Sequence, residues 1–267
     1  MALGCGLEHL DDMLLANTYG GVLVLAASRP GMGKTAFVTN IVRRTAGDLG
    51  RPLGLLLAGS ATEVFARRLL AAFASIPLRR LCRAHLEDQE KKRLRRALKT
   101  VAALPLHVME TPGFSPEEIR AAAEQLKARD NVAAIVVDHL ETWWEHNEMV
   151  TSSRADGIIT VLKEIACDLD MPILATVNVA CPWTPRQARN YARNGFFAQA
   201  LCRMESVTRC ADILSVIDCE DAYHMAEPNY TATGLTTFLI ARNSLGPTGL
   251  VNVAMDPDLC LFVAPDP

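Results

Sequence analysis

Eight consecutive residues, Ser28-Arg-Pro-Gly-Met-Gly-Lys-Thr35, combine two glycines, a lysine and a hydroxyl side chain directly after a short apolar run. Backbone N–H groups of such a turn, with the N-terminus of the following helix, surround phosphate oxygens. In this pattern the Lys34 ammonium reaches the β- and γ-phosphates, the Thr35 hydroxyl holds Mg²⁺, and Gly33 permits close backbone approach. The sequence therefore predicts a nucleoside triphosphate site. The alternative is an ordinary strand-turn-helix connection with an exposed lysine.

The general phosphate-loop pattern fails at one position, because Ser28 stands where its first glycine is expected. The nucleotide-binding prediction still covers the whole turn and the start of the helix. The residues that we expect to contact ATP are Arg29, Gly31, Met32, Gly33, Lys34, Thr35 and Ala36.

A carboxylate placed at the end of a strand could complete a metal site. Residues 132–137 are all apolar, and Asp138 follows them directly. Ligands of open α/β sheets bind beyond the carboxyl ends of the strands, where Asp138 could orient a Mg²⁺-bound water. Without a phosphate loop in the same chain, an aspartate at the end of a strand would be interpreted as a turn cap. Together with the phosphate loop it is predicted to serve, with Thr35, at the metal site.

Apolar strand-like runs alternate with helical patterns, which is typical of a largely parallel sheet with helices on both faces. Strands are predicted at 22–27, 53–58, 106–110, 132–137 and 172–177, and helices at 35–46, 63–74, 86–103, 115–129 and 153–168. Later strands near 213–217, 236–241 and 250–254 follow one another with turns between them. The sheet is therefore expected to finish in antiparallel pairs.

Composition narrows the class of protein. The 267 residues carry 27 Lys and Arg against 30 Asp and Glu, and 50% are hydrophobic, which excludes a disordered chain. No apolar run approaches the roughly 18 residues of a membrane span, and the first residues lack the basic region of a signal peptide. We therefore expect a cytoplasmic protein with no membrane partner. Its eight cysteines form no Cys-x-x-Cys pair and are read as reduced thiols.

The net charge of −3 argues against a wholly basic nucleic-acid binder but leaves a local basic surface open. The helix predicted at 86–103 is one place to look, since it contains Lys91, Lys92, Arg93, Arg95 and Arg96. Acids precede these cations along the helix. We therefore interpret this helix as a solvated charged face rather than a phosphate contact.

In this order, the segments resemble the C-terminal RecA-like ATPase domain of DnaB-type replicative DNA helicases over nearly the whole chain. The more specific strings are the phosphate loop itself and Gly246-Pro-Thr-Gly249; weaker matches are Ile135 to Leu140, resembling the family's Walker B strand, and Ala211-Asp212. That family often lacks the first loop glycine as well. The resemblance implies a single domain over 1–267 with an α/β, RecA-like P-loop NTPase fold, built on a mainly parallel twisted sheet.

The same resemblance implies Mg²⁺-dependent ATP hydrolysis coupled to movement along single-stranded DNA in replication. Departures fall on the catalytic positions: Gly59 replaces the water-activating glutamate, Asn178 replaces the γ-phosphate-sensing glutamine, and Ser244 replaces the arginine finger. Arg242 keeps a positive charge at the first position of the family's Lys-x-Arg pair, which acts across a subunit interface. Losing both base and finger would leave ATP bound but hydrolysed very slowly.

Replacements for the lost groups are available in the chain. Glu141, three residues after Asp138, is our candidate substitute base, with Glu63 as another, and Arg242 could act as the finger. The predicted catalytic set is therefore Lys34, Asp138, Glu141, Asn178 and Arg242.

Single-stranded DNA contacts are expected in the loop after Asn178. Arg186, Arg189 and Arg193 alternate there with Trp183 and Tyr191, and cations interleaved with aromatics suit a single strand. An ordinary solvated loop is the equal alternative.

The core motif already begins near Gly6, so we expect the chain to lack the family's N-terminal helical domain. A homo-hexamer and a replication-protein partner are the partners that the resemblance implies. A catalytically weakened paralogue that regulates or assembles with a true helicase is the alternative function. A small-molecule P-loop kinase is a third.

Overall fold

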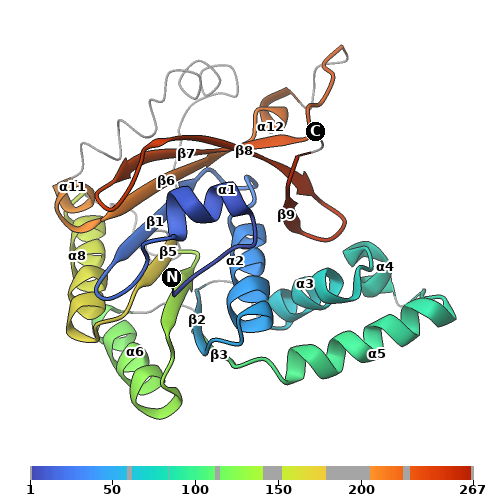
Figure 1. The fold of residues 1–267 in the computed structure, drawn as a ribbon, viewed down its shortest axis with the longest axis horizontal. Coiled ribbons are helices and arrows are strands. Elements are labelled where there is room, and N and C mark those ends of the chain that lie inside the picture. Colours follow the sequence, from blue (N-terminus) through green and yellow to red (C-terminus); the bar gives the residue numbers. More distant parts are fainter. Residues whose placement is uncertain are drawn as a thin grey trace.

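The computed structural model describes residues 2–58, 62–83, 85–111, 115–140, 152–178, 205–224 and 229–265. Its centre is a nine-stranded sheet with the strand order β3-β2-β4-β5-β1-β6-β7-β8-β9 (Figure 1). The strands are β1 Leu23–Ser28, β2 Leu53–Ala58, β3 Leu106–Thr111, β4 Ala134–Asp138, β5 Ile173–Asn178, β6 Ile213–Asp218, β7 Leu235–Asn243, β8 Gly249–Asp256 and β9 Leu261–Val263.

Strands β1 to β6 all pair in parallel, whereas β7, β8 and β9 continue the sheet as antiparallel neighbours. The predicted mainly parallel sheet with an antiparallel end is therefore confirmed. Strand β2 has the predicted bounds, and the other predicted strands differ by one or two residues. The pattern missed β9, because three residues are too few to show alternation.

The helical elements are α1 Glu8–Leu10, η1 Asp11–Leu15, α2 Lys34–Val42, η2 Arg43–Asp48, α3 Thr62–Ala74, α4 Leu78–Arg83, α5 Asp88–Ala102, α6 Pro116–Asp130, α8 Ser152–Asp168, α11 Glu205–Cys210 and α12 Asp221–His224. The predicted cap of α6 is confirmed, since the Ser115 hydroxyl accepts from the Glu118 N–H, 3.2 Å away. Helix α5 begins later than predicted, because Glu87 and Glu90 form a capping box there. The helix predicted at 35–46 divides into α2 and the π-helical turn η2.

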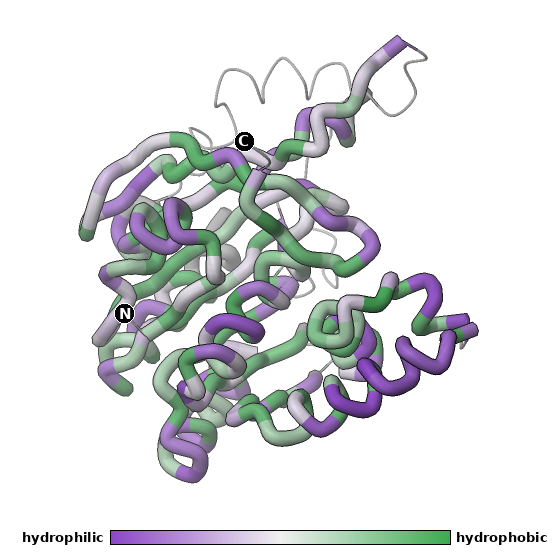
Figure 2. The backbone as a smooth tube through the Cα atoms, turned by 45° about the vertical axis from the view of Figure 1, so that its right-hand side comes forward, coloured by the Kyte–Doolittle hydropathy of each residue, from purple (hydrophilic) through white to green (hydrophobic). Residues whose placement is uncertain are grey.

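Helices cover both faces of the sheet, as expected. Successive residues of β1 point to opposite faces: Leu23, Leu25 and Ala27 pack in one hydrophobic cluster, and Val24 and Ala26 in the other. Helices α6 and α8 close the first cluster, whereas the N-terminal segment, α2 and α3 close the second. The hydropathy-coloured tube shows the apolar strands between the more polar helices (Figure 2).

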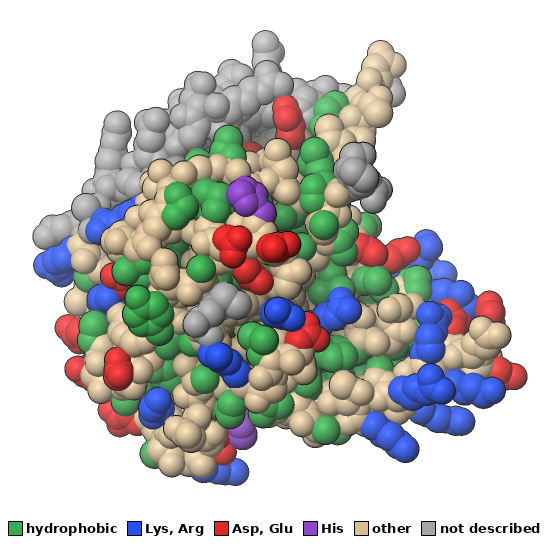
Figure 3. All heavy atoms as spheres, viewed as in Figure 1, with side chains coloured by type: hydrophobic (Ala, Val, Ile, Leu, Met, Phe, Trp, Pro, Cys, Tyr) green, Lys and Arg blue, Asp and Glu red, His purple; other side chains and the backbone are tan. Residues whose placement is uncertain are grey.

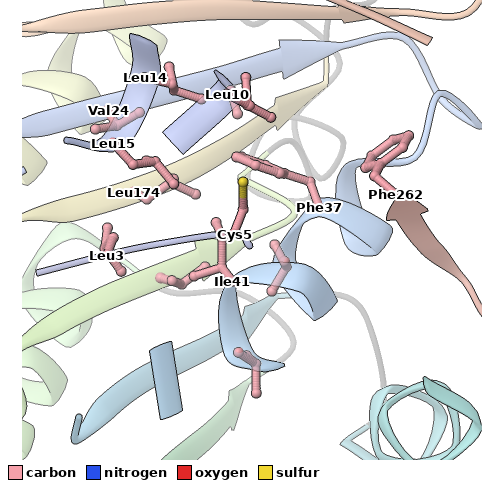
Figure 4. Close-up of a cluster of buried hydrophobic side chains, with 14 of the residues drawn as sticks. Leu3, Cys5, Leu10, Leu14, Leu15, Val24, Phe37, Ile41, Leu174 and Phe262 are labelled. Atoms are coloured by element: carbon pink, nitrogen blue, oxygen red, sulfur yellow. The ribbon is translucent and has the colours of Figure 1, made fainter. Parts of the chain in front are cut away.

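The side chain of Asn40 joins helix α2 to the short strand β9. Its amide donates to the Phe262 carbonyl and accepts from the Phe262 N–H, both at 2.8 Å, in the manner of a neighbouring strand. The Phe262 ring packs edge-on against Phe238, which in turn contacts Phe37 of α2. Phe37 and Phe262 lie at one end of the cluster that contains Cys5 and Ile41 (Figure 4). This packing fixes the helix that follows the phosphate loop.

Among the described residues, no helix combines the length and apolar character needed to cross a membrane. The six cysteines in this part of the chain, Cys5, Cys82, Cys167, Cys210, Cys219 and Cys260, are all free thiols, as expected.

Candidate nucleotide-binding site

The predicted residues Asp138 and Asn178 meet the start of the phosphate loop at one edge of the sheet. Ser28 ends β1, Asn178 ends β5 and Asp138 ends β4, and these three strands are consecutive neighbours. Ser28 and Asn178 are directly opposite each other in the parallel register. The phosphate loop therefore leaves the sheet beside Asn178, and Asp138 lies one strand further along.

Two glycines shape the loop between β1 and α2. Gly31 and Gly33 have φ values of 81° and 95°, a region that L-residues with a side chain rarely adopt. Gly33 is the N-cap of α2 and offers no side chain to the first amides of the helix. No N-cap side chain competes with an anion at the start of α2, and the positive end of the helix dipole faces the loop.

Lys34 lies across the loop and is 5% exposed. Its ammonium donates to Ser28 Oγ at 3.2 Å, to the Arg29 carbonyl at 3.4 Å and to Asn178 Oδ1 at 3.2 Å. These acceptors are uncharged, so the positive charge of Lys34 is held in the loop without being neutralised by them. The predicted sensor residue Asn178 is thus brought into direct contact with the predicted phosphate-binding lysine.

The metal-binding pair is also brought together. Thr35 Oγ1 donates to Asp138 Oδ2 across 3.1 Å, and the Asp138 side chain is fully buried. A hydroxyl and a carboxylate are hard oxygen ligands of the kind that Mg²⁺ prefers. The donor set therefore fits Mg²⁺, and the loop with its buried ammonium fits a polyphosphate. Both predicted roles are consistent with this geometry.

Two residues that the sequence analysis missed hold the carboxylate in place. Thr176 of β5 donates its hydroxyl to Asp138 Oδ1 at 2.6 Å and accepts from the His139 N–H at 2.9 Å. The His139 ring lies with Nε2 3.0 Å from Thr35 Oγ1, on a backbone with φ of 65°. A threonine inside the otherwise apolar run 172–177 was the available signal for this buried contact.

Removing the Thr176 hydroxyl should weaken metal-dependent nucleotide binding. In Thr176→Val we expect about tenfold more Mg²⁺ to be needed for half-maximal binding of a fluorescent ATP analogue, because groups that orient metal ligands contribute about 10- to 100-fold in affinity. Ser215→Ala is the matched control. This buried β6 hydroxyl has no hydrogen-bond partner among the described residues, and its loss should leave the Mg²⁺ requirement unchanged. An unchanged requirement in Thr176→Val would mean that Asp138 does not depend on this bond.

A further carboxylate missed in the sequence lies on the same face of the sheet. Glu110 of β3 and Asp138 of β4 are both level with Leu57 of the intervening strand β2. Residues level with one another across parallel strands point to the same side. Glu110 Oε2 accepts from the Thr62 N–H at 2.9 Å, and hydrogen bonding to the Thr62 side chain first, and to this N–H second, lowers the pKa of the Glu110 carboxyl. Glu110 therefore stays ionised and anchors the start of α3.

Of the other predicted site residues, some lie outside the described residues and the others lie on α3 or near the end of β7. Glu141, Arg186, Arg189 and Arg193, together with Gly59, lie outside the described residues. Glu63 is exposed on the first turn of α3 and pairs with Arg67 of the same helix.

Arg242 and Ser244 lie at the opposite edge of the sheet from the phosphate loop. Arg242 is level with Leu214 at the start of β6, whereas Phe238 is level with Ile217 and Ser28 at the loop. Three residues of β6, or about 10 Å, separate these levels, β7 lies two strand spacings of about 4.8 Å from β1, and an arginine side chain spans roughly 7 Å. Arg242 therefore cannot reach its own loop. The Ser244 hydroxyl donates to the Asp212 carbonyl at 3.0 Å, which ties the end of β7 to β6.

Comparison with known families agrees with this geometry. The family described as "DnaB-like helicase C terminal domain" matches residues 2–264. The chain belongs to this family. The RecA-like fold expected from the sequence is also found in a solved structure described as "The Structure Of A DnaB-Like Replicative Helicase And Its Interactions With Primase", with a TM-score of 0.79, 20% identity, and coverage of 98% of this chain and 62% of the other.

Two curated relatives show how much of a DnaB-like helicase this chain represents. It is 26% identical over 264 residues to a protein of Trieres chinensis named "Probable replicative DNA helicase", and 25% identical over 260 residues to "Replicative DNA helicase DnaC" of Bacillus subtilis (strain 168). Each alignment covers 97% of this chain but only 56% and 55% of the relative. The chain thus spans about half the length of these replicative helicases.

Proposed function

We propose that this DnaB-like chain binds Mg²⁺ and ATP at the phosphate loop and couples ATP hydrolysis to translocation along single-stranded DNA in DNA replication. The observation that carries the proposal is the meeting of Lys34, Thr35, Asp138 and Asn178 at one sheet edge, in a member of a helicase family. With ATP bound, Lys34 and the first amides of α2 hold the phosphates. Thr35 and Asp138 would hold Mg²⁺, which neutralises charge on the transferred phosphate.

Asn178 gives the site a way to respond to the γ-phosphate. Its Oδ1 accepts from the Lys34 ammonium at 3.2 Å. The Lys34 ammonium has three N–H donors and already serves Ser28, Arg29 and Asn178, so a phosphate oxygen has to displace one of them. We propose that Asn178 is the one released and that β5 carries the change to the residues after it. The predicted DNA loop with Arg186, Arg189 and Arg193 follows Asn178 directly in the sequence. We propose that this connection couples nucleotide state to DNA contact.

Water activation needs a carboxylate, since Gly59 stands at the family's glutamate position. Glu141 remains our proposal, because it follows the metal-binding Asp138 by three residues. Glu110, on the same face as Asp138, could compete for the role, as could the exposed Glu63 of α3. Glu141→Gln is expected to lower turnover, and Glu110→Gln tests the first of these competitors in the same assay. An unchanged rate in Glu141→Gln would remove it from this role.

Arg242 can act only on a neighbouring subunit, since it cannot reach its own loop. We propose that it supplies the finger charge across an interface in a ring, a homo-hexamer by analogy with the family. The similar solved DnaB-like replicative helicase interacts with primase, and a replication-protein partner of this kind is part of the proposal.

The proposal predicts that single-stranded DNA stimulates ATP turnover at least about tenfold, and that both Lys34→Ala and Arg242→Ala abolish the stimulation. Only Lys34→Ala should lose ATP affinity. An equal mixture of the two variants should regain activity, because about a quarter of randomly formed interfaces would join an intact loop to an intact Arg242. Steady-state phosphate release with and without a 30-nucleotide strand measures this.

The outcome separates the proposal from its alternative. ATP binding without DNA-stimulated turnover would contradict the motor and favour a catalytically weakened paralogue that regulates or assembles with a true helicase. Gly59 and Ser244 motivate that alternative, since a missing finger and base would reduce the hydrolysis rate by about 10³–10⁵ and 10²–10⁴ respectively. Absence of recovery in the mixture would remove Arg242 as the residue acting in trans.

A further inference from the structure

The outer surface of α5 carries a strongly basic region on a chain that is acidic overall. Residues 79–99 contain nine Lys and Arg and three Asp and Glu, whereas the rest of the chain has 18 Lys and Arg and 27 Asp and Glu. The space-filling view shows Lys and Arg side chains gathered over α4 and α5 (Figure 3). In the tube view the same helix is largely hydrophilic (Figure 2).

The geometry of α5 arranges four of these cations in one line. The side of the helix that packs inward holds buried Glu90 and Ala97, with Leu94 and Val101 packed against the hydrophobic clusters. Positions 92, 95, 96 and 99 follow the spacing i, i+3, i+4, i+7 and lie on the side opposite to them. We call Lys92, Arg95, Arg96 and Lys99 the α5 stripe. All four are exposed, and the stripe is about 10 Å long at 1.5 Å per residue.

The acids of this region pair with other cations, which leaves the stripe uncompensated. Glu90 accepts from Arg80 of α4 at 2.8 Å, with Arg93 at 4.0 Å, and Glu87 also pairs with Arg80. Asp88 pairs with Lys91 at 3.0 Å, and its pKa is lowered chiefly by that bond and slightly by Arg95. Within the described part of the chain, the stripe residues form no ion pair of their own. The helix is a solvated charged face, as the sequence indicated, and its acids reach Lys91 and Arg93 of the same helix as well as Arg80 of α4.

We infer that the α5 stripe binds the phosphate backbone of nucleic acid. A line of four uncompensated cations complements a line of phosphates, and each phosphate contact releases counterions. A protein partner would be expected to bring apolar and aromatic anchors, but residues 78–102 contain no Phe, Trp or Tyr, and Leu98 alone among their large hydrophobic residues is markedly exposed, at 47%. Because the stripe has no aromatic side chain on which a base could stack, we expect it to contact the phosphate backbone without sequence preference.

This surface is separate from the proposed ATP site. Helix α5 packs beside α3, whose Phe65 and Leu69 belong to the hydrophobic cluster on the sheet, and the stripe lies on the side of α5 that faces away from this packing (Figure 1). The inference therefore does not depend on ATP hydrolysis, and it adds a nucleic-acid contact outside the loop that contains Arg186, Arg189 and Arg193.

The test is the salt dependence of DNA binding by the full chain without nucleotide. Fluorescence anisotropy with a labelled 30-nucleotide single strand of mixed sequence, and with the matching duplex, is measured across a NaCl series. For the single strand, each lost phosphate contact lowers the slope of log K against log salt by about 0.7. We expect a reduction of about 1.4 in Lys92→Gln/Arg95→Gln, the same in Arg96→Gln/Lys99→Gln, and about 2.8 in the quadruple variant.

Lys127→Gln/Arg129→Gln on α6 is the matched control, with the same change in net charge as each half of the stripe. The slope of log K for DNA binding against log salt should stay at the wild-type value in this control. All variants should keep the wild-type ATP affinity. Three results would overturn the inference: an unchanged slope in the quadruple variant, an equal loss in the α6 control, or tighter binding of a poly-glutamate of equal charge than of DNA. The last would assign the stripe to an acidic protein.

Discussion

Lys34→Ala is expected to weaken ATP binding by at least about 100-fold while the chain remains folded. The ammonium is buried against Ser28, Arg29 and Asn178, so a bound polyphosphate meets a lysine already aimed at it. Hydrogen bonds to charged groups contribute about 1.5–3 kcal/mol each, and two of them account for a factor of 100 or more. Equilibrium binding of ATP and urea unfolding together measure the two parts of the expectation.

Lys163→Ala is the matched control for this variant. Lys163 is also largely buried, and it donates to the Gly21 carbonyl and to Asp212 Oδ2, both at 2.7 Å, near the opposite edge of the sheet. Its loss should lower stability without changing ATP affinity. Wild-type ATP affinity in Lys34→Ala would show that the loop is only a strand-turn-helix connection.

Gly33→Ala should destabilise the chain by about 2–5 kcal/mol, the sum of about 1–2 kcal/mol for a left-handed residue and about 1–3 kcal/mol for overpacking. A Cβ at this position would lie 2.5 Å from Cζ of Phe262, and φ is +95°. Phe262 cannot easily move away, because Asn40 holds its backbone through two hydrogen bonds of 2.8 Å. Urea unfolding without nucleotide measures the loss.

Gly31→Ala separates the two causes. Gly31 has a similar φ of +81°, but no atom lies within 4 Å of the Cβ it would gain. Gly31→Ala should therefore lower the free energy of unfolding only by the backbone term of about 1–2 kcal/mol. Adding Phe262→Leu should recover part of the stability lost in Gly33→Ala and none of that lost in Gly31→Ala. Equal losses in the two glycine variants would contradict the close contact between β9 and the loop.

Sequence patterns predicted the elements whose own residues determine them. The fully apolar strands, the Ser115 cap of α6 and the loop glycines each depend on local spacing, and each is found in the structure. The meeting of Thr35 with Asp138 was also expected, because parallel strands bring their carboxyl ends to one edge, whereas the hydrogen bond between Lys34 and Asn178 was not predicted.

The parts that sequence could not predict depend on contacts between distant segments. Thr176 looked like one residue of an apolar strand until β5 was placed beside β4, where its hydroxyl meets Asp138. The contact between α4 and α5 is of the same kind, because spacing along α5 gives no sign that the fold brings Arg80 from α4 to Glu90. Strand β9 has only three residues, and its role at the site is to place the Phe262 ring against Gly33 of the phosphate loop.

The central claim is that the edge formed by Lys34, Thr35, Asp138 and Asn178 is a Mg²⁺-dependent ATP site. The most direct measurement is calorimetric titration of the wild-type chain with ATP, in Mg²⁺ and again in EDTA. The account predicts one site per chain, with a Kd between about 1 µM and 1 mM in Mg²⁺, and weaker binding when the metal is removed. No binding at millimolar ATP, or an affinity that ignores both EDTA and Lys34→Ala, would contradict it.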